Sequence, residues 1–339
     1  MISESNSCDP VKSGTMGRFA LFAGTANPVL AAAIAGALDT ELDPCHVERF
    51  PDGEISVRLD ASVRGREVFI VQPTAPPVND NLVELLAFAD ACRRASAERI
   101  TVVVPYFGYS RSDRRNRRRE PIMASLTAEL LQCSGIDHVV LVDVHTPQVE
   151  GFFRVPVDSL TAVPVLCARI REQLPSDAVS DLVVVSPDAG RVPMATEYAR
   201  RLGAPLAVLH KRRDGPGDVT VMHLVGDVKG RSCLIADDMI STGSTIVESV
   251  RALRSSGALL DITAVATHGL LLHGARERLA ASGVRRMFIT DSVADTYTGH
   301  SLSQPQQPPE IDIHVASIAP LLASAIRRQL ADESLSDLF

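Results

Sequence analysis

Two adjacent acidic residues, Asp237 and Asp238, follow an apolar run and precede a short turn of small residues, Ser-Thr-Gly-Ser-Thr at 241–245. Such a turn suits a sugar phosphate. Small residues let several backbone N–H groups approach one anion, and a helix starting near Ile246 would add the partial positive charge of its N-terminus. Adjacent carboxylates repel one another unless hydroxyl groups, water or a cation separate them. We therefore expect the pair to bind ribose hydroxyl groups or a magnesium ion, with a plain structural turn as the alternative.

A second segment, Phe-Pro-Asp-Gly-Glu at 50–54, has the composition of a nucleobase site. The ring of Phe50 could lie against a base, and the carboxylates of Asp52 and Glu54 could accept hydrogen bonds from an exocyclic amine. Pro-Asp-Gly is also a strong turn-forming sequence. By itself, the segment is more simply interpreted as a turn.

Basic residues gather in two places. A run rich in arginine, 111–119, lies between an expected strand and a helix expected near Pro121, which suits a polyphosphate, although such runs are more often solvated surface. Lys211, Arg212 and Arg213 precede a Gly-Pro-Gly-Asp turn at 215–218, so a mobile lid could carry cations onto a reacting phosphate. Basic triplets are common on protein surfaces, so this one indicates a functional role only in combination with the other segments.

Two further polar residues follow apolar runs: His145, in Asp-Val-His at 143–145, and Asp188, in Ser-Pro-Asp at 186–188. Either could bind a metal ion, directly or through water. A lone histidine is more often structural, so the position of these residues after strands favours a binding role more than their residue types do.

Short apolar runs that alternate with helical patterns connect these segments, which is typical of parallel sheets covered by helices on both faces. The expected strands are 20–22, 68–72, 100–105, 139–142, 182–186, 206–209, 233–236, 262–267, 287–290 and 311–316, and an amphipathic helix is expected at 319–330. The fold class is therefore α/β. In open α/β sheets, ligands bind beyond the carboxyl ends of the strands, so the polar strand ends predict a single active site.

The composition excludes several classes of protein. The 339-residue chain has 45% hydrophobic residues and a net charge of −7, which argues against a general nucleic-acid binder. No apolar run is long enough to span a bilayer, and residues 1–16 lack the apolar core of a signal peptide. The six cysteines form no Cys-x-x-Cys pair, which fits buried thiols in a reducing compartment. We expect a cytoplasmic protein that binds neither membranes nor nucleic acid.

In combination, the segments resemble the ribose-phosphate pyrophosphokinase (phosphoribosyl pyrophosphate synthetase) family. The resemblance extends in order from Phe19 to Phe339 and rests on residues 50–54, 76–86, 93–96, 105–109, 143–158, 186–190, 225–228, 237–245, 267–269 and 334–339. It implies two phosphoribosyltransferase-type domains, each a mostly parallel sheet flanked by helices. We expect a disordered polar extension at 1–17, domains at 18–160 and 161–316, and a C-terminal helix and tail at 317–339 that pack back on the first domain.

The resemblance also implies an activity: Mg²⁺-dependent transfer of the diphosphoryl group of ATP to O1 of ribose 5-phosphate, giving phosphoribosyl pyrophosphate and AMP. It makes Lys211 and Arg213 catalytic and His145 and Asp188 metal ligands. The implied ATP-binding residues are Phe50, Asp52, Gly53, Glu54, Arg111, Ser112, Asp113, Arg114 and His145. The implied ribose 5-phosphate-binding residues are Arg213, Asp237, Asp238, Ser241, Thr242, Gly243, Ser244 and Thr245. Family members are usually hexamers built from dimers, in which the 50–54 segment would reach the ATP of a neighbouring subunit.

Five positions depart from the family pattern. Ser112 and Glu150 stand where Gln is usual, Arg191 where a second Gly follows Ala-Gly, Met194 where a basic residue is common, and Ser241 where an Asp begins the phosphate turn. Arg191 could reshape a turn in which glycine permits unusual dihedral angles, and its charge could replace the cation missing at 194. A catalytically weakened paralogue acting as a regulatory subunit is therefore the alternative. The 50–54 segment and the second domain disfavour a nucleobase phosphoribosyltransferase.

Overall fold

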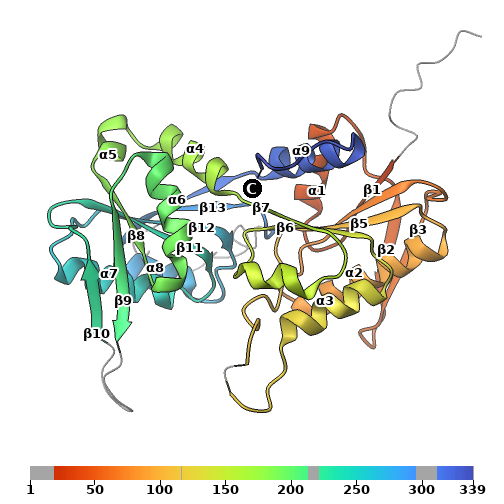
Figure 1. The fold of residues 1–339 in the computed structure, drawn as a ribbon, viewed down its shortest axis with the longest axis horizontal. Coiled ribbons are helices and arrows are strands. Elements are labelled where there is room, and N and C mark those ends of the chain that lie inside the picture. The colour runs from red at the N-terminus through yellow and green to blue at the C-terminus, as the bar shows by residue number, and fades with distance from the viewer. Residues whose placement is uncertain (1–18, 116, 213–220, 295–310, 339) are drawn as a thin grey trace, which may run out of the picture.

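The computed structural model describes residues 19–115, 117–212, 221–294 and 311–338, with no side chains described at 177, 211, 212, 221 and 222. The polar extension expected at 1–17 and the turn at 215–218 lie outside these residues. The described chain forms two large sheets and a separate hairpin, with helices on both faces of the large sheets (Figure 1). This architecture confirms the α/β class predicted from the alternating strand and helix patterns.

The first sheet has five parallel strands in the order β1-β4-β5-β6-β7. They are β1 (Phe19–Ala23), β4 (Glu67–Val71), β5 (Arg99–Val104), β6 (His138–Val142) and β7 (Val157–Leu160). The central strands are buried on both faces, which is why they appear in the sequence as continuous apolar runs. An antiparallel hairpin, β2 (Cys45–Arg49) and β3 (Ile55–Leu59), instead alternates half-buried and exposed residues.

The second sheet has seven strands in the order β10-β9-β8-β11-β12-β13-β14, and β10 runs antiparallel to β9 at one edge. Its strands are β8 (Leu182–Ser186), β9 (Leu206–Arg212), β10 (Val221–Val225), β11 (Ser232–Ile240), β12 (Ile262–Gly269), β13 (Val284–Thr290) and β14 (Asp312–Ala316). Strand β11 lies at the centre between β8 and β12. The acidic pair is thus carried by the central strand of the sheet.

Helices cover both sheets. They are α1 (Pro28–Ala37), α2 (Val78–Arg94), α3 (Met123–Cys133), α4 (Val163–Gln173), α5 (Ser176–Ser180), α6 (Val192–Leu202), α7 (Ser244–Ser255), α8 (Ala275–Ser282) and α9 (Ala319–Leu330), with 3-10 helices η2 (Pro147–Phe152) and η3 (Ala189–Arg191). In Figure 1, α1, α4 and α9 lie on one side of the two sheets, and α2, α3, α7 and α8 on the other. Helix α6 packs into the same core as α1, α4 and α9. The C-terminal helix α9 packs against α1 near the start of the chain.

One hydrophobic core is shared by the two sheets. It joins side chains of β1 and β6 in the first sheet to β8 and β11 in the second, through α1, α4, α6 and α9; Leu21, Leu166, Val184 and Leu322 are fully buried members. Each sheet has its own core on the opposite face, against α2 and α3 or against α7 and α8. The shared core holds the carboxyl ends of the two sheets in a defined relation, which is what an active site between them requires.

Local sequence signals explain several helix ends. Asn27 caps α1, since its side-chain oxygen accepts a hydrogen bond from Leu30 N over 3.1 Å. Helix α6 ends at Gly203, which has φ of 70°. These signals could be read from the sequence, because the residue types themselves favour the conformations.

Each strand expected from an apolar run is present. The sequence did not predict β2, β3, β7 or β10, because these strands are short or lie at edges and lack a continuous apolar run. Among the described helices, none combines the length and apolar character needed to cross a membrane.

Candidate active site

The two adjacent carboxylates are buried inside β11. Asp237 and Asp238 are 8% and 1% exposed, and β11 continues to Ile240 beside β12 instead of ending at Ala236 as the sequence suggested. Asp237 Oδ1 accepts a hydrogen bond from Asp238 N over 2.9 Å. Burial, and then the charge of Asp238, raise the pKa of Asp237 well above its usual range. The pair therefore needs positive charge close by.

Arg191 supplies that charge. Its Nε lies 3.2 Å from an oxygen of each carboxylate, Asp237 Oδ1 and Asp238 Oδ1. Its Nη1 donates to the main-chain oxygen of His145 over 2.8 Å, and its Nη2 lies 2.6 Å from Nδ1 of the His145 imidazole ring. The Arg191 side chain is 12% exposed. It thus joins η3, β11 and the loop after β6.

The turn that carries Arg191 does not require glycine. Arg191 has φ of −96° and ψ of 0° at the start of α6, outside the left-handed region that favours glycine. The side chain that replaces glycine at this position has therefore not reshaped the backbone of the turn. Met194 packs partly buried against the shared core, so Arg191, and not position 194, brings positive charge to this loop.

The predicted nucleotide side and the predicted sugar side of the site meet at His145 and Asp238. His145 Nδ1 lies 2.8 Å from Asp238 Oδ2. Burial alone would raise the pKa of Asp238, but the hydrogen bond to His145 and the charge of Arg191 outweigh burial and lower it. Asp238 is therefore held in its charged form, with His145 and Arg191 as its partners.

Asp188 lies at the start of the Arg191 turn. Its Oδ1 accepts hydrogen bonds from Gly190 N over 2.8 Å and Arg191 N over 3.1 Å. Among the residues that the structure describes, no three His, Cys, Asp or Glu side chains are arranged to hold a metal ion. Mg²⁺ is usually held by one or two carboxylates together with substrate phosphates. Asp188 fits that role, whereas the ring of His145 lies against Asp238 and Arg191 in this state.

The predicted phosphate turn begins α7 directly. Gly243 has φ of 77°, and a Cβ there would lie 2.9 Å from Leu279 Cγ, so both the backbone and the neighbouring side chain require glycine. Helix α7 starts at Ser244, two residues earlier than expected. Arg278 of α8 donates from Nε (3.1 Å) and Nη2 (2.9 Å) to the main-chain oxygen of Thr242. The turn therefore combines a helix N-terminus with a nearby cation, as an anion site does.

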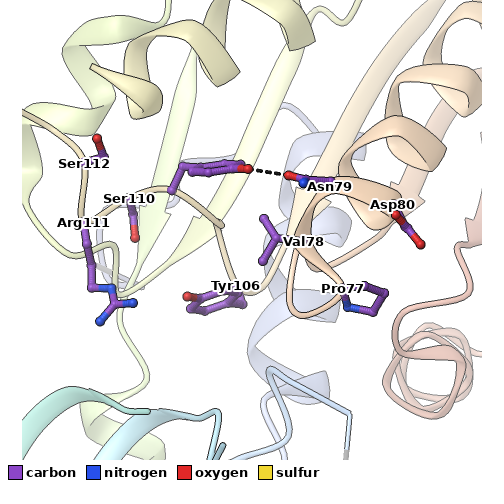
Figure 2. Close-up of a pocket in the computed structure, with 9 residues that line it drawn as sticks. Pro77, Val78, Asn79, Asp80, Tyr106, Ser110, Arg111 and Ser112 are labelled. Atoms are coloured by element: carbon purple, nitrogen blue, oxygen red, sulfur yellow. Dashed lines mark hydrogen bonds between the residues drawn. The ribbon is translucent and has the colours of Figure 1, made fainter. Parts of the chain in front are cut away.

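A cavity of about 740 Å³ lies at the end of β5 (Figure 2), a size typical of small-molecule sites. It is lined by Pro77, Val78, Asn79, Asp80, Tyr106, Tyr109, Ser110, Arg111 and Ser112. The Tyr109 hydroxyl donates to Asn79 Oδ1. Burial raises the pKa of Tyr106, while the charge of Arg111 lowers it and that of Asp238 raises it. Tyr106 also belongs to the same packed cluster as Met239, the residue after Asp238, so the cavity lies beside the strand that carries the carboxylate pair.

The basic segment after β5 is attached to the His145 loop. Asp113 Oδ2 accepts a hydrogen bond from Thr146 Oγ1 over 2.7 Å. Ser112 Oγ accepts from Met123 N at the start of α3 over 3.3 Å. Arg111 and Arg114 are exposed, so their guanidinium groups are accessible to a ligand.

The 50–54 segment forms the tip of the β2–β3 hairpin. Phe50 N donates to Glu54 O over 2.8 Å, and Glu54 N donates to Asp52 Oδ1 over 3.1 Å. Phe50 is 41% exposed, and the segment does not line the cavity. The turn interpretation is therefore correct for the local structure, and a role in nucleotide binding stays a prediction.

The two predicted catalytic residues fall at the limit of the described chain. Lys211 lies in β9 opposite Met222 of β10, with no side chain described. Arg213 lies outside the described residues.

Sequence reasoning gave no role to Arg278 or Tyr106. Tyr106 follows a strand end, a signal that could have identified it. Arg278 lies on α8 and contacts Thr242, which is 36 residues earlier in the chain, so only the fold reveals the pair.

Comparisons with known proteins identify the family of the chain. A family model for the N-terminal domain of ribose phosphate pyrophosphokinase matches residues 19–135, and one for a phosphoribosyl transferase domain matches residues 157–298. The ribose-phosphate pyrophosphokinase of Maricaulis maris is 46% identical over 319 residues, covering 94% of this chain and 99% of the relative. That of Chromobacterium violaceum is 45% identical over 320 residues, covering 94% of each.

A solved structure shows the same architecture. The crystal structure of phosphoribosylpyrophosphate synthetase from Mycobacterium smegmatis matches with a TM-score of 0.83 and 43% sequence identity, covering 93% of this chain and 99% of the other. By sequence and by structure, the chain belongs to the ribose-phosphate pyrophosphokinase family of enzymes.

Proposed function

We propose that this protein transfers the diphosphoryl group of ATP to O1 of ribose 5-phosphate in the presence of Mg²⁺, giving phosphoribosyl pyrophosphate and AMP. Family membership supports the reaction class. The observation that carries the proposal is the 2.8 Å contact between His145 and Asp238. It puts a residue predicted to bind the donor beside a residue predicted to bind the acceptor, and transfer between two substrates requires such proximity.

The acceptor would occupy the region around β11 and the start of α7. Backbone N–H groups of the 241–245 turn and the N-terminus of α7 would bind the 5-phosphate, with Arg278 adding positive charge. Asp237 and Asp238 would accept hydrogen bonds from ribose hydroxyl groups. Ser241 can still donate a hydrogen bond to phosphate, although it lacks the carboxylate usual in the family.

The donor would occupy the cavity and the basic segment beside it. Tyr106 and Tyr109 offer aromatic surface at the cavity wall, and Arg111 and Arg114 offer charge for a polyphosphate. Bound Mg²⁺ would neutralise phosphate charge and help hold the phosphate oxygens in line, with Asp188 and His145 as its predicted ligands. Lys211 and Arg213 would stabilise the charge that develops during transfer.

We further propose a cytoplasmic homo-oligomer built from dimers, with domains at 18–160 and 161–316. The packing of α9 on α1 supports a tail that returns to the first domain. The exposed ring of Phe50 suits a contact with the ATP of a neighbouring subunit.

Arg191 favours a second candidate function. Its side chain contacts His145 and both carboxylates, so substrates that bind to these groups would have to compete with it. A chain with its site filled in this way could act as a regulatory subunit of a competent enzyme.

Phosphorus NMR of the purified protein with Mg²⁺, ATP and ribose 5-phosphate separates the two functions. Equal appearance of AMP and phosphoribosyl pyrophosphate supports the enzyme. If ATP binds and neither product forms, the stand-alone activity is refuted and the regulatory role is favoured.

A further inference from the structure

Arg191 lies where three potential metal-ligating side chains converge. Its guanidinium is within 3.2 Å of Asp237 and Asp238 and within 2.6 Å of the His145 ring. The three neighbours come from β11 and the loop after β6, and Arg191 itself comes from η3. Carboxylates and imidazole rings are groups that bind divalent cations, but with Arg191 among them the three side chains are not arranged to hold a metal ion.

Burial makes a cation at this position necessary. The side chains of Asp237 and Asp238 are 12% and 2% exposed, and two neighbouring carboxylates in such surroundings are unstable without compensating positive charge. A guanidinium is fixed in the chain, stays charged at any pH the fold tolerates and offers several N–H donors in one plane. One of these donors, the N–H group at Nε of Arg191, lies close to both carboxylates.

The same guanidinium also connects segments that are far apart in the sequence. Nη1 donates to the main-chain oxygen of His145, 46 residues away, while Nε contacts β11. A divalent cation could not take this position without displacing Arg191, because like charges repel strongly at these separations.

We propose that Arg191 is a built-in cation that takes the place of a divalent metal ion between Asp237, Asp238 and His145. The free protein therefore binds no divalent cation at this position, and Mg²⁺ enters the site only with the nucleotide. Arg191 also acts as a positioning residue that holds the His145 loop against β11. The inference goes beyond the proposed activity, and its test contains no substrate, so it stands or fails independently of catalysis.

Mn²⁺ binding to the free protein, followed by electron paramagnetic resonance, tests this inference. Arg191→Gln removes the charge and should create a new Mn²⁺ site at the carboxylate pair. The dissociation constant of this site should be at least about tenfold lower than that of any Mn²⁺ binding by the same carboxylates in the unmodified protein. Arg191→Lys keeps a positive charge and should create none. Adding Asp238→Asn to Arg191→Gln should abolish the new site. Arg231→Gln, which removes an ion pair with Asp181 at the other end of β11, is the matched control and should leave Mn²⁺ binding unchanged.

A second comparison does not depend on the folding of Arg191→Gln. Asp238→Asn alone should leave the Mn²⁺ binding of the free protein unchanged, because the proposal leaves no metal at this carboxylate. Weaker Mn²⁺ binding in Asp238→Asn would overturn the inference, and so would a folded Arg191→Gln protein that gains no site.

Discussion

The Thr267 hydroxyl donates a hydrogen bond of 2.6 Å to the Asp143 carboxylate, which joins β12 of the second sheet to the loop after β6 of the first. The same carboxylate accepts hydrogen bonds from Thr161 Oγ1 over 2.8 Å and Ala162 N over 2.9 Å. His145 lies two residues further along this loop. The position of His145 relative to β11 therefore depends on a carboxylate that bridges the two sheets.

Asp143→Asn should weaken this bridge. Asp143 has φ of 38°, a conformation that asparagine tolerates, so the backbone should be unchanged. One carboxylate oxygen is replaced by an amide NH₂ group, which is a donor and would face the donors that now bond to the carboxylate. We expect the free energy of unfolding to fall by about 1–3 kcal/mol in urea denaturation, with weaker ATP binding by calorimetry. The control Asp90→Asn, at an exposed ion pair on α2, should leave both nearly unchanged. Unaltered stability of Asp143→Asn would show that the bridge contributes nothing.

Asp237→Asn should stabilise the fold at neutral pH and reduce activity. The raised pKa of Asp237 means that ionising it costs more in the folded than in the unfolded state. That cost is present above the folded-state pKa and disappears as the pH falls below the ordinary aspartate value of about 3.9. The gain in unfolding free energy should therefore be largest near pH 7 and shrink in acid, while the loss of a sugar ligand lowers activity about 100-fold. Urea denaturation at several pH values measures the first effect.

Asp238→Asn is the matched control and should change stability in the opposite direction. The pKa of Asp238 is lowered, so its charge stabilises the folded state above the ordinary aspartate pKa, and that contribution is lost as the pH falls through the folded-state pKa. At pH 7 the variant should be less stable than the unmodified protein. A gain in stability for both variants would contradict the opposed pKa shifts.

Much of the fold could be predicted because its strands are buried on both faces. Continuous apolar runs such as residues 139–142 are typical of parallel strands that are covered by helices on both faces. The hairpin carrying Phe50 was read only as a turn, because its strands are half-exposed and its stability comes from packing against α2. Such tertiary support leaves little trace in a local sequence.

The sequence identified the segments that form the candidate site, but it did not predict the contacts between their side chains. Asp188, His145 and Asp238 were identified from their position after apolar runs, although Asp238 lies within β11 and not after its end. The sequence marked Arg191 as unusual but did not indicate that its side chain would reach both carboxylates and His145 at once. Contacts between three elements depend on how the sheets are packed together, which no local pattern encodes.

Lys211→Ala should reduce kcat far more than it raises the KM for ATP. An ammonium group that stabilises charge developing during transfer contributes to the transition state and little to the ground state. We expect kcat to fall about 100- to 1,000-fold, measured by following AMP formation. Lys229→Ala, at an exposed lysine beside the turn before β11, should leave kcat unchanged. A loss confined to apparent ATP affinity would refute the catalytic role of Lys211.

Gly243→Ala should damage the phosphate turn specifically. At φ of 77°, a Cβ would meet Leu279 Cγ at 2.9 Å, so the substitution combines backbone strain with a clash against α8. We expect the free energy of unfolding to fall by about 1–3 kcal/mol and the KM for ribose 5-phosphate to rise, because the start of α7 must shift. Gly36→Ala in α1 has open space around its Cβ and should stabilise the protein by about 0.5–1 kcal/mol. Thermal unfolding of both variants with and without ribose 5-phosphate decides the point: if ribose 5-phosphate stabilises Gly243→Ala as much as the unmodified protein, the turn does not bind the phosphate.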